Sequence, residues 1–172
     1  MCSSDLADCA IAGYDFCEPM LELGRARAQK ESVPLEFKVG DCMRLPIADA
    51  SQDVVTIAYG VRNFEDRARG LGELRRILRP GGTLLILEFS RPDAWFRPFH
   101  FLHVRCVLPL LAGVLTGDFG AYRYLGTSIA GFPDAAGLDA ELRAAGFAQV
   151  SHKKMLFGTV ALDRKSTRLN SS

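Results

Sequence analysis

Short apolar runs and amphipathic stretches alternate along the first ninety residues. Strands are predicted where the runs are continuously apolar, at Ala10–Tyr14, Leu35–Val39, Asp53–Tyr59 and Thr83–Phe89. Helices are predicted where apolar residues recur at helical spacing, at Glu18–Gln29 and Phe64–Leu78, and Pro80-Gly81-Gly82 ends the second. The order strand, helix, strand, strand, helix, strand predicts an α/β fold with a mostly parallel, doubly wound sheet.

The C-terminal third has a different pattern. Residues 91–117 are aromatic and apolar but hold three prolines, which indicates an irregular or broken helix that covers something apolar. A short helix is predicted at Asp134–Ala145, with Gly146 at its C-terminal cap. Phe147–Met155 and Gly158–Asp163 follow as two strands around a turn, so we expect an antiparallel edge to the sheet.

Composition limits the class of protein. A chain of 172 residues with 48% hydrophobic and 24% charged residues is typical of one globular domain. A net charge of +1, from 21 basic and 20 acidic residues, gives no basic surface for nucleic acid. The five cysteines are odd in number and lack C-x-x-C spacing, so we expect neither a metal site nor a disulfide framework, and a reduced cytoplasmic setting.

Neither a membrane span nor a secretory signal is expected. The most apolar run, Val107–Leu115, has nine residues, whereas a span needs about 20. Residues 1–6 and 165–172 are polar, serine-rich strings that resemble appended sequence, so the fold is expected within residues 10–164. We expect a cytoplasmic protein that contacts a membrane surface at its periphery.

Carboxylates stand directly after two neighbouring strands. Asp15 can accept both hydroxyls of a ribose, and Phe16 can lie against an adenine face. Asp41 can accept an adenine amine while the backbone of Cys42 or Met43 meets the ring edge. The alternatives are a helix cap at Asp15 and an ordinary turn at Asp41. Together the two carboxylates favour an adenosine site.

Four segments resemble one enzyme family. They read DFCEPMLELGRARA from residue 15, YGVRN from residue 59, EFSRP from residue 88 and AYRYLGTSIAGFPD from residue 121. In these segments the chain resembles the S-adenosylmethionine-dependent C-methyltransferases that act on polyprenyl quinols in ubiquinone and menaquinone synthesis. The resemblance covers residues 10–164 and implies a Rossmann-like class I methyltransferase fold with S-adenosylmethionine as cofactor.

The resemblance also implies roles for individual residues. Asp15 would hold the cofactor ribose, Asp41 with the Cys42 backbone would hold the adenine, and Ala58 would face the cofactor. Arg62 and Asn63 would lie beside the quinol ring. Because an arginine stays protonated, Arg62 would hold a phenolate or an ordered water; the alternative is a surface arginine after a strand. Tyr122, with Tyr124, would line the ring pocket or assist proton transfer.

One feature of the family pattern is missing. The family begins with a central strand that carries a glycine-rich turn, and this chain has neither. We therefore expect the strands at Ala10 and Asp53 to lack a partner, and the chain to bind S-adenosylmethionine weakly or not at all. The expected substrate is a quinol of the demethylmenaquinol or methoxy-polyprenyl-benzoquinol type. The alternatives are another small molecule or lipid as acceptor, or an inert methyltransferase-like module; a homo-oligomer stays open.

Overall fold

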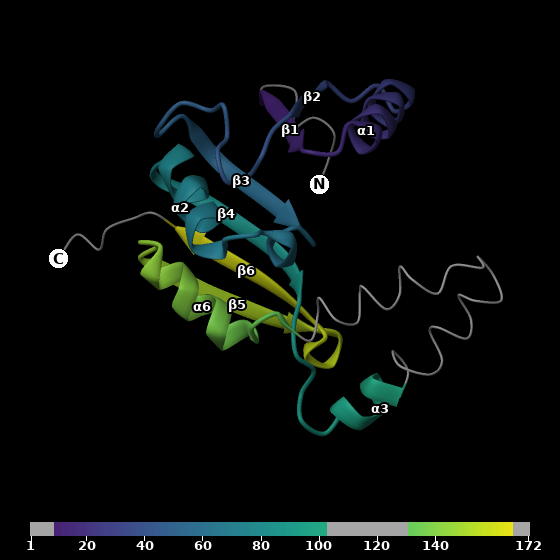
Figure 1. Ribbon diagram of the computed structural model, residues 1–172, viewed down its shortest axis with the longest axis vertical. Coiled ribbons are helices and arrows are strands. Elements are labelled where there is room, and N and C mark those ends of the chain that lie inside the picture. The colour runs from purple at the N-terminus through teal and green to yellow at the C-terminus, as the bar shows by residue number, and fades with distance from the viewer. Residues whose placement is uncertain (1–8, 103–130, 167–172) are drawn as a thin grey trace. The chain divides into compact units, whose positions relative to one another are not determined.

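The computed structural model describes residues 9–102 and 131–166 (Figure 1). The chain forms two compact units, Met1–Pro46 and Ile47–Ser172.

The first unit is a strand, a helix and a parallel strand. Strand β1 (Ile11–Asp15) pairs in parallel with β2 (Leu35–Val39), and helix α1 (Glu18–Lys30) connects them. These bounds confirm the predicted elements to within one residue. Leu21 is the residue of α1 that is buried, because the helix shows one narrow apolar stripe.

The second unit is built on a four-stranded sheet. Its strands are β3 (Gln52–Ala58), β4 (Leu78–Phe89), β5 (Gln149–Met155) and β6 (Val160–Ser166), in the order β3-β4-β6-β5 (Figure 1). The pair β3 and β4 is parallel, whereas β6 is antiparallel to both of its neighbours. The antiparallel C-terminal edge expected from the sequence is therefore confirmed.

The start of β4 differs from the expectation. The sequence predicts a strand from Thr83, but β4 already begins at Leu78, which pairs with Gln52. The register then shifts between Gln52 and Val54, so that Val54 pairs with Thr83. A bulge of this kind absorbs the proline and glycines without ending the pairing.

Helix α2 (Arg67–Ile77) begins three residues later than predicted. Asp66 is its N-cap, and the Asp66 carboxylate accepts a hydrogen bond of 3.0 Å from the backbone N–H of Arg69. Before this cap, Val61–Asn63 form the short 3-10 helix η2. The side chains of Leu71, Leu74 and Ile77 are the buried stripe of α2, as the spacing predicts.

The buried face of β4 extends into a polar end. Leu84 and Ile86 are fully buried, and at the same two-residue spacing Glu88 and Ser90 are buried as well. Towards the C-terminus, helix α6 (Ala135–Ala144) packs against β5. Gly146 has a φ of 91° and follows the helix end, which confirms its predicted role as the cap.

The remaining described elements are α3 (Arg97–Leu102) and the 3-10 helix η4 (Leu156–Gly158). Within the described residues, β1 pairs with β2 alone and β3 with β4 alone. Over the same residues, no helix combines the length and the apolar content that a membrane span requires.

Candidate functional site

The carboxylates of Asp15 and Asp41 stand at one edge of the first unit. Parallel pairing places Asp15 opposite Val39, so the loop that holds Asp41 begins directly beside it. The backbone N–H of Gly40 also donates to the carbonyl of Asp15, at 3.0 Å. Both strands end at the same register, and Gly40 directly after β2 allows the chain to turn there.

Both carboxylates hold their own loop in the same manner. Asp15 Oδ1 accepts from the backbone N–H of Cys17, and Asp41 Oδ1 accepts from that of Met43, each at 2.9 Å. Cys17 is the residue before α1, so Asp15 makes no hydrogen bond to the first turn of the helix. The alternative that Asp15 caps this helix is therefore wrong. These two-residue loops fix the direction of each carboxylate through Oδ1, and each Oδ2 makes no hydrogen bond to another described residue.

The two carboxylates share the neighbourhood of Cys42. Burial raises the pKa of the Cys42 thiol, and the negative charges of Asp41 and Asp15 raise it further. The carboxylates of Asp15 and Asp41 therefore both lie close enough to the Cys42 thiol to raise its pKa. Phe16 is 79% exposed, so its ring has an open face, and its contact with adenine stays a prediction.

The end of β3 carries the second group of predicted residues. Ala58 closes the strand and is exposed. Tyr59 follows with a φ of 55°, a conformation that is uncommon for a large side chain and costs about 1–3 kcal/mol. Its ring packs on that of Phe89 at 4.7 Å between centroids. Such strained turns occur preferentially at functional sites.

Arg62 lies inside the protein, so the alternative of a surface arginine is wrong. Its side chain is 12% exposed and that of Glu88 is 1% exposed, and Arg62 Nη1 donates to Glu88 Oε1 at 2.9 Å. The Arg62 backbone N–H donates to Glu88 Oε2 at 3.2 Å. The guanidinium carbon lies 5.3 Å from the Phe89 ring centroid and 6.0 Å from that of Tyr59.

The carbonyl of Tyr59 is the second anchor of this group. Arg62 Nη1 donates to it, and the exposed side chain of Asn63 donates to it at 3.5 Å. Arg62 Nε is buried and has no hydrogen-bond partner among residues 9–102 and 131–166. Within the described residues Nη2 also makes no hydrogen bond, so it is the nitrogen that remains for a ligand.

Glu88 is the residue that the sequence reasoning did not single out. It accepts from Arg62 and also from the backbone N–H of Phe89, at 2.9 Å. The signal was present, since a glutamate at a buried position of an otherwise apolar strand needs a partner for its charge.

The predicted residues fall into two groups. Asp15, Asp41 and Cys42 come together in the first unit, whereas Ala58, Arg62 and Asn63 come together in the second. Tyr122 and Tyr124 lie outside the described residues, so their roles stay predictions.

Known proteins resemble the chain in fold and in sequence. A SAM-dependent methyltransferase of Thermotoga maritima superposes with a TM-score of 0.64, 20% identity, and coverage of 91% of this chain and 72% of that one. The YcgJ protein of Bacillus subtilis superposes with a TM-score of 0.64 and 17% identity, and the match covers 94% of this chain and 83% of that one. These structures confirm the Rossmann-like class I methyltransferase fold.

Relatives in sequence are closer. The demethylmenaquinone methyltransferase of Thermus thermophilus is 42% identical over 88% of this chain and 69% of its own length. The ubiquinone/menaquinone biosynthesis C-methyltransferase UbiE of Dinoroseobacter shibae is 42% identical over 86% of this chain and 60% of its own length. The chain thus spans 60% to 69% of these relatives. The pattern of the ubiE/COQ5 methyltransferase family matches residues 3–166, and the chain belongs to that family.

Proposed function

We propose that the whole protein transfers a methyl group from S-adenosylmethionine to a ring carbon of a polyprenyl quinol in respiratory quinone synthesis. Family membership supports methyl transfer, and the names of the relatives support a demethylmenaquinol or a related benzoquinol as the acceptor. The observation that carries the proposal within this chain is the pair of carboxylates at the ends of β1 and β2.

The residues present fit the adenosine half of the cofactor. Ribose hydroxyls and the adenine amine are hydrogen-bond donors, and they need fixed acceptors. Asp15 and Asp41 each offer a carboxylate whose direction is set by its own loop. Phe16 offers an exposed ring for stacking. The Cys42 backbone would meet the adenine edge, whereas the Met43 N–H already donates to Asp41 Oδ1, which leaves the Met43 carbonyl. Ala58 has no polar group, so it contributes packing or a backbone contact.

The quinol side of the proposal rests on Arg62. When bound, S-adenosylmethionine supplies an electrophilic methyl group. The ring carbon beside a phenolic oxygen becomes more nucleophilic as the phenol ionises, and a fixed cation stabilises the phenolate. Glu88 and the Tyr59 carbonyl hold Arg62 through Nη1, which leaves Nη2 for the quinol oxygen. Asn63 would hold a second oxygen, and Tyr122 would line the ring pocket or move the proton.

Contact with a membrane surface belongs to the same proposal, because polyprenyl quinols reside in membranes. On α3 and beside it, Trp95, Phe99 and Leu102 are 59% to 65% exposed, and Phe157 of η4 is 59% exposed. Aromatic side chains of this kind favour the interface between lipid and water. A protein that is cytoplasmic and peripheral to the membrane is consistent with these side chains.

The test is transfer of radiolabelled methyl from S-adenosylmethionine to demethylmenaquinol and to a methoxy-polyprenyl-benzoquinol by the whole protein. We expect labelled quinol, and a loss of kcat of at least about tenfold in Arg62→Lys, which keeps the charge but loses the planar fork. Arg69→Lys is the control, because Arg69 is an exposed residue of α2 and should leave kcat unchanged. Label found only in a sterol or phospholipid acceptor, or in none, would refute the proposal.

A further inference from the structure

Glu88 is a charged side chain in an apolar place. It follows Leu84 and Ile86 on β4 at the two-residue spacing of a buried face, and its own side chain is 1% exposed. Taking a carboxylate out of water costs free energy, and a buried ion pair often stabilises a fold no more than apolar side chains of similar volume do. Stability alone therefore does not explain why a glutamate stands at this position.

The carboxylate of Glu88 holds Arg62 at two points. Oε2 accepts from the Arg62 backbone N–H at 3.2 Å, and Oε1 accepts from Nη1 at the tip of the same side chain at 2.9 Å. An arginine side chain has several rotatable bonds, and holding it at its base and at its tip leaves few of its rotamers open. One carboxylate thus fixes both where the Arg62 side chain begins and where it ends.

The end of the sheet fixes the carboxylate itself. β3 and β4 pair as far as Ala58 and Leu87, so the backbone of Phe89 lies beyond the last pair of these two strands. The Phe89 N–H donates to Glu88 Oε1 at 2.9 Å. Both carboxylate oxygens are thereby in use, with donors from Arg62 and Phe89. Glu88 therefore ties the turn after β3 to the end of β4.

A ligand can reach Arg62 but not Glu88. The Arg62 side chain is 12% exposed, and among the described residues its Nη2 makes no hydrogen bond and, unlike Nε, is not enclosed. The Tyr59 carbonyl, which accepts from Nη1, and the rings of Tyr59 and Phe89 restrict the guanidinium further. Tyr59 is itself held, because its N–H donates to the carbonyl of Leu87 at 2.8 Å. Glu88 can therefore act on a ligand only through Arg62.

We propose that Glu88 is the positioning residue for Arg62 in methyl transfer, and that its carboxylate holds the guanidinium with Nη2 directed to the quinol oxygen. The inference rests on the function proposed above and adds that Glu88 sets the rate without touching the quinol. A donor that is already fixed stabilises developing negative charge without reorienting, whereas a free arginine must first lose its rotamer freedom. Loss of Glu88 should slow the transfer step and leave cofactor binding unchanged.

The test measures kcat and KM for transfer of labelled methyl from S-adenosylmethionine to demethylmenaquinol by the whole protein, with rates per folded molecule from circular dichroism. We expect Glu88→Gln to lower kcat at least about tenfold and to keep KM for S-adenosylmethionine within about twofold. An unchanged kcat in Glu88→Gln beside an active wild type would overturn the inference alone. A wild type that methylates no quinol would refute the proposed function and this inference with it.

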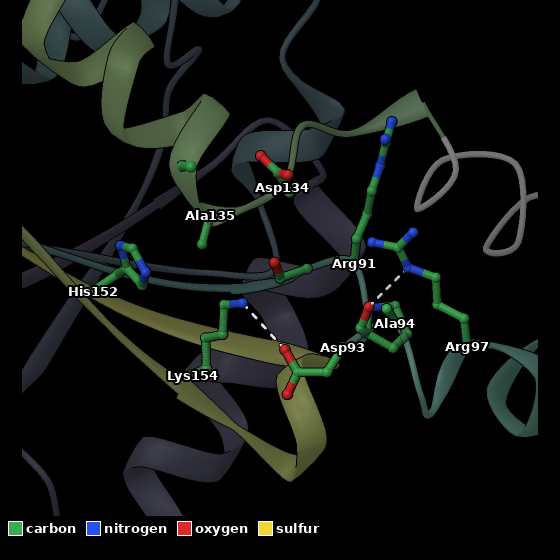
Figure 2. Close-up of a pocket in the computed structure, with 11 residues that line it drawn as sticks. Arg91, Asp93, Ala94, Arg97, Asp134, Ala135, His152 and Lys154 are labelled. Carbon is green, nitrogen blue, oxygen red and sulfur yellow. Dashed lines mark hydrogen bonds and ion pairs between the residues drawn. The ribbon is translucent and has the colours of Figure 1, made fainter.

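Asp139→Asn is the matched control, because Asp139 is also a buried carboxylate paired with another side chain. Its Oδ2 lies 2.8 Å from Nδ1 of His152, in a pair that joins α6 to β5. Figure 2 shows His152 at a hollow of about 260 Å³, whose lining includes neither Arg62 nor Glu88. We expect Asp139→Asn to lower the urea midpoint, as Glu88→Gln does, but to leave kcat per folded molecule unchanged. An equal loss of kcat in both variants would overturn the inference.

A double-mutant cycle of kcat shows whether Glu88 acts through Arg62. The double variant Arg62→Lys/Glu88→Gln should have a kcat within about threefold of that of Arg62→Lys, because the lysine already lacks the planar fork that Glu88 holds. Losses that multiply in the double variant, to about a hundredfold or more, would mean that Glu88 acts independently of Arg62. That result would overturn the inference.

Nitrogen-15 NMR of the arginine side chains tests the positioning without a substrate. Because the Arg62 guanidinium is held, its rotation should be slow enough for Nη1 and Nη2 to give separate signals, which their loss in Arg62→Lys identifies. These signals should merge in Glu88→Gln and stay separate in Asp139→Asn. Signals that stay separate in Glu88→Gln would overturn the inference.

Discussion

Substitution of Glu88 tests how the second unit holds its arginine. Glu88→Gln keeps the shape of the side chain but replaces an acceptor oxygen with a donor amide. It would face Arg62, whose side chain is 12% exposed and whose Nη1 and backbone N–H both donate to the carboxylate. Removing one partner of a buried ion pair leaves the other charge uncompensated, which costs about 3–5 kcal/mol. We expect a loss of this size in the free energy of unfolding.

Urea unfolding followed by circular dichroism at 222 nm measures the loss, and a separate double-mutant cycle, made of the single variants Arg62→Met and Glu88→Leu and their double variant, isolates the pair. The double variant Arg62→Met/Glu88→Leu removes both charges, so its free energy of unfolding should lie within about 2 kcal/mol of the wild type. The reasoning fails if Glu88→Gln costs less than about 1 kcal/mol, or if the two single losses simply add in the double variant.

Two other predictions concern a thiol and two glycines. Because the negative charge of Asp41 helps to raise the pKa of the Cys42 thiol, Asp41→Asn should lower that pKa and increase the thiolate fraction at pH 8. Iodoacetamide should then alkylate Cys42 faster, as mass spectrometry of each cysteine measures. An unchanged or slower rate would contradict this. An added Cβ meets open space at both Gly146 and Gly72, but Gly146 has a φ of 91° whereas Gly72 lies inside α2. The free energy of unfolding, measured by urea titration, should therefore fall by about 1–2 kcal/mol in Gly146→Ala and rise by up to about 1 kcal/mol in Gly72→Ala. A change of the same sign in both variants would refute the argument.

Local sequence signals predicted much of the fold. The strand Leu35–Val39 and the cap at Gly146 follow from short apolar runs and from the special conformations open to glycine. The carboxylates of Asp15 and Asp41 could be placed at one edge because parallel strands end on the same side of a sheet. In each case the deciding interaction lies within a few residues or within one pair of strands.

Interactions between distant residues were harder to predict. Arg62 could be placed near the end of β3, but its burial depends on Glu88, 26 residues further along the chain. The early start of β4 depends on a bulge opposite Gln52, which no local pattern reveals. Ser90 stands in the EFSRP segment, and its burial follows from a distant part of the chain, since its backbone N–H donates to the carbonyl of Thr159.

Calorimetric titration of the whole protein with S-adenosylmethionine tests the role of the two strand-end carboxylates most directly. Asp15→Asn should weaken binding at least about tenfold, because it replaces a charged acceptor with a neutral amide. Asp53→Asn makes the same change at the opposite end of a strand, on an exposed residue beside Arg79, and should leave the affinity unchanged. Equal affinities of wild type, Asp15→Asn and Asp53→Asn would contradict the account.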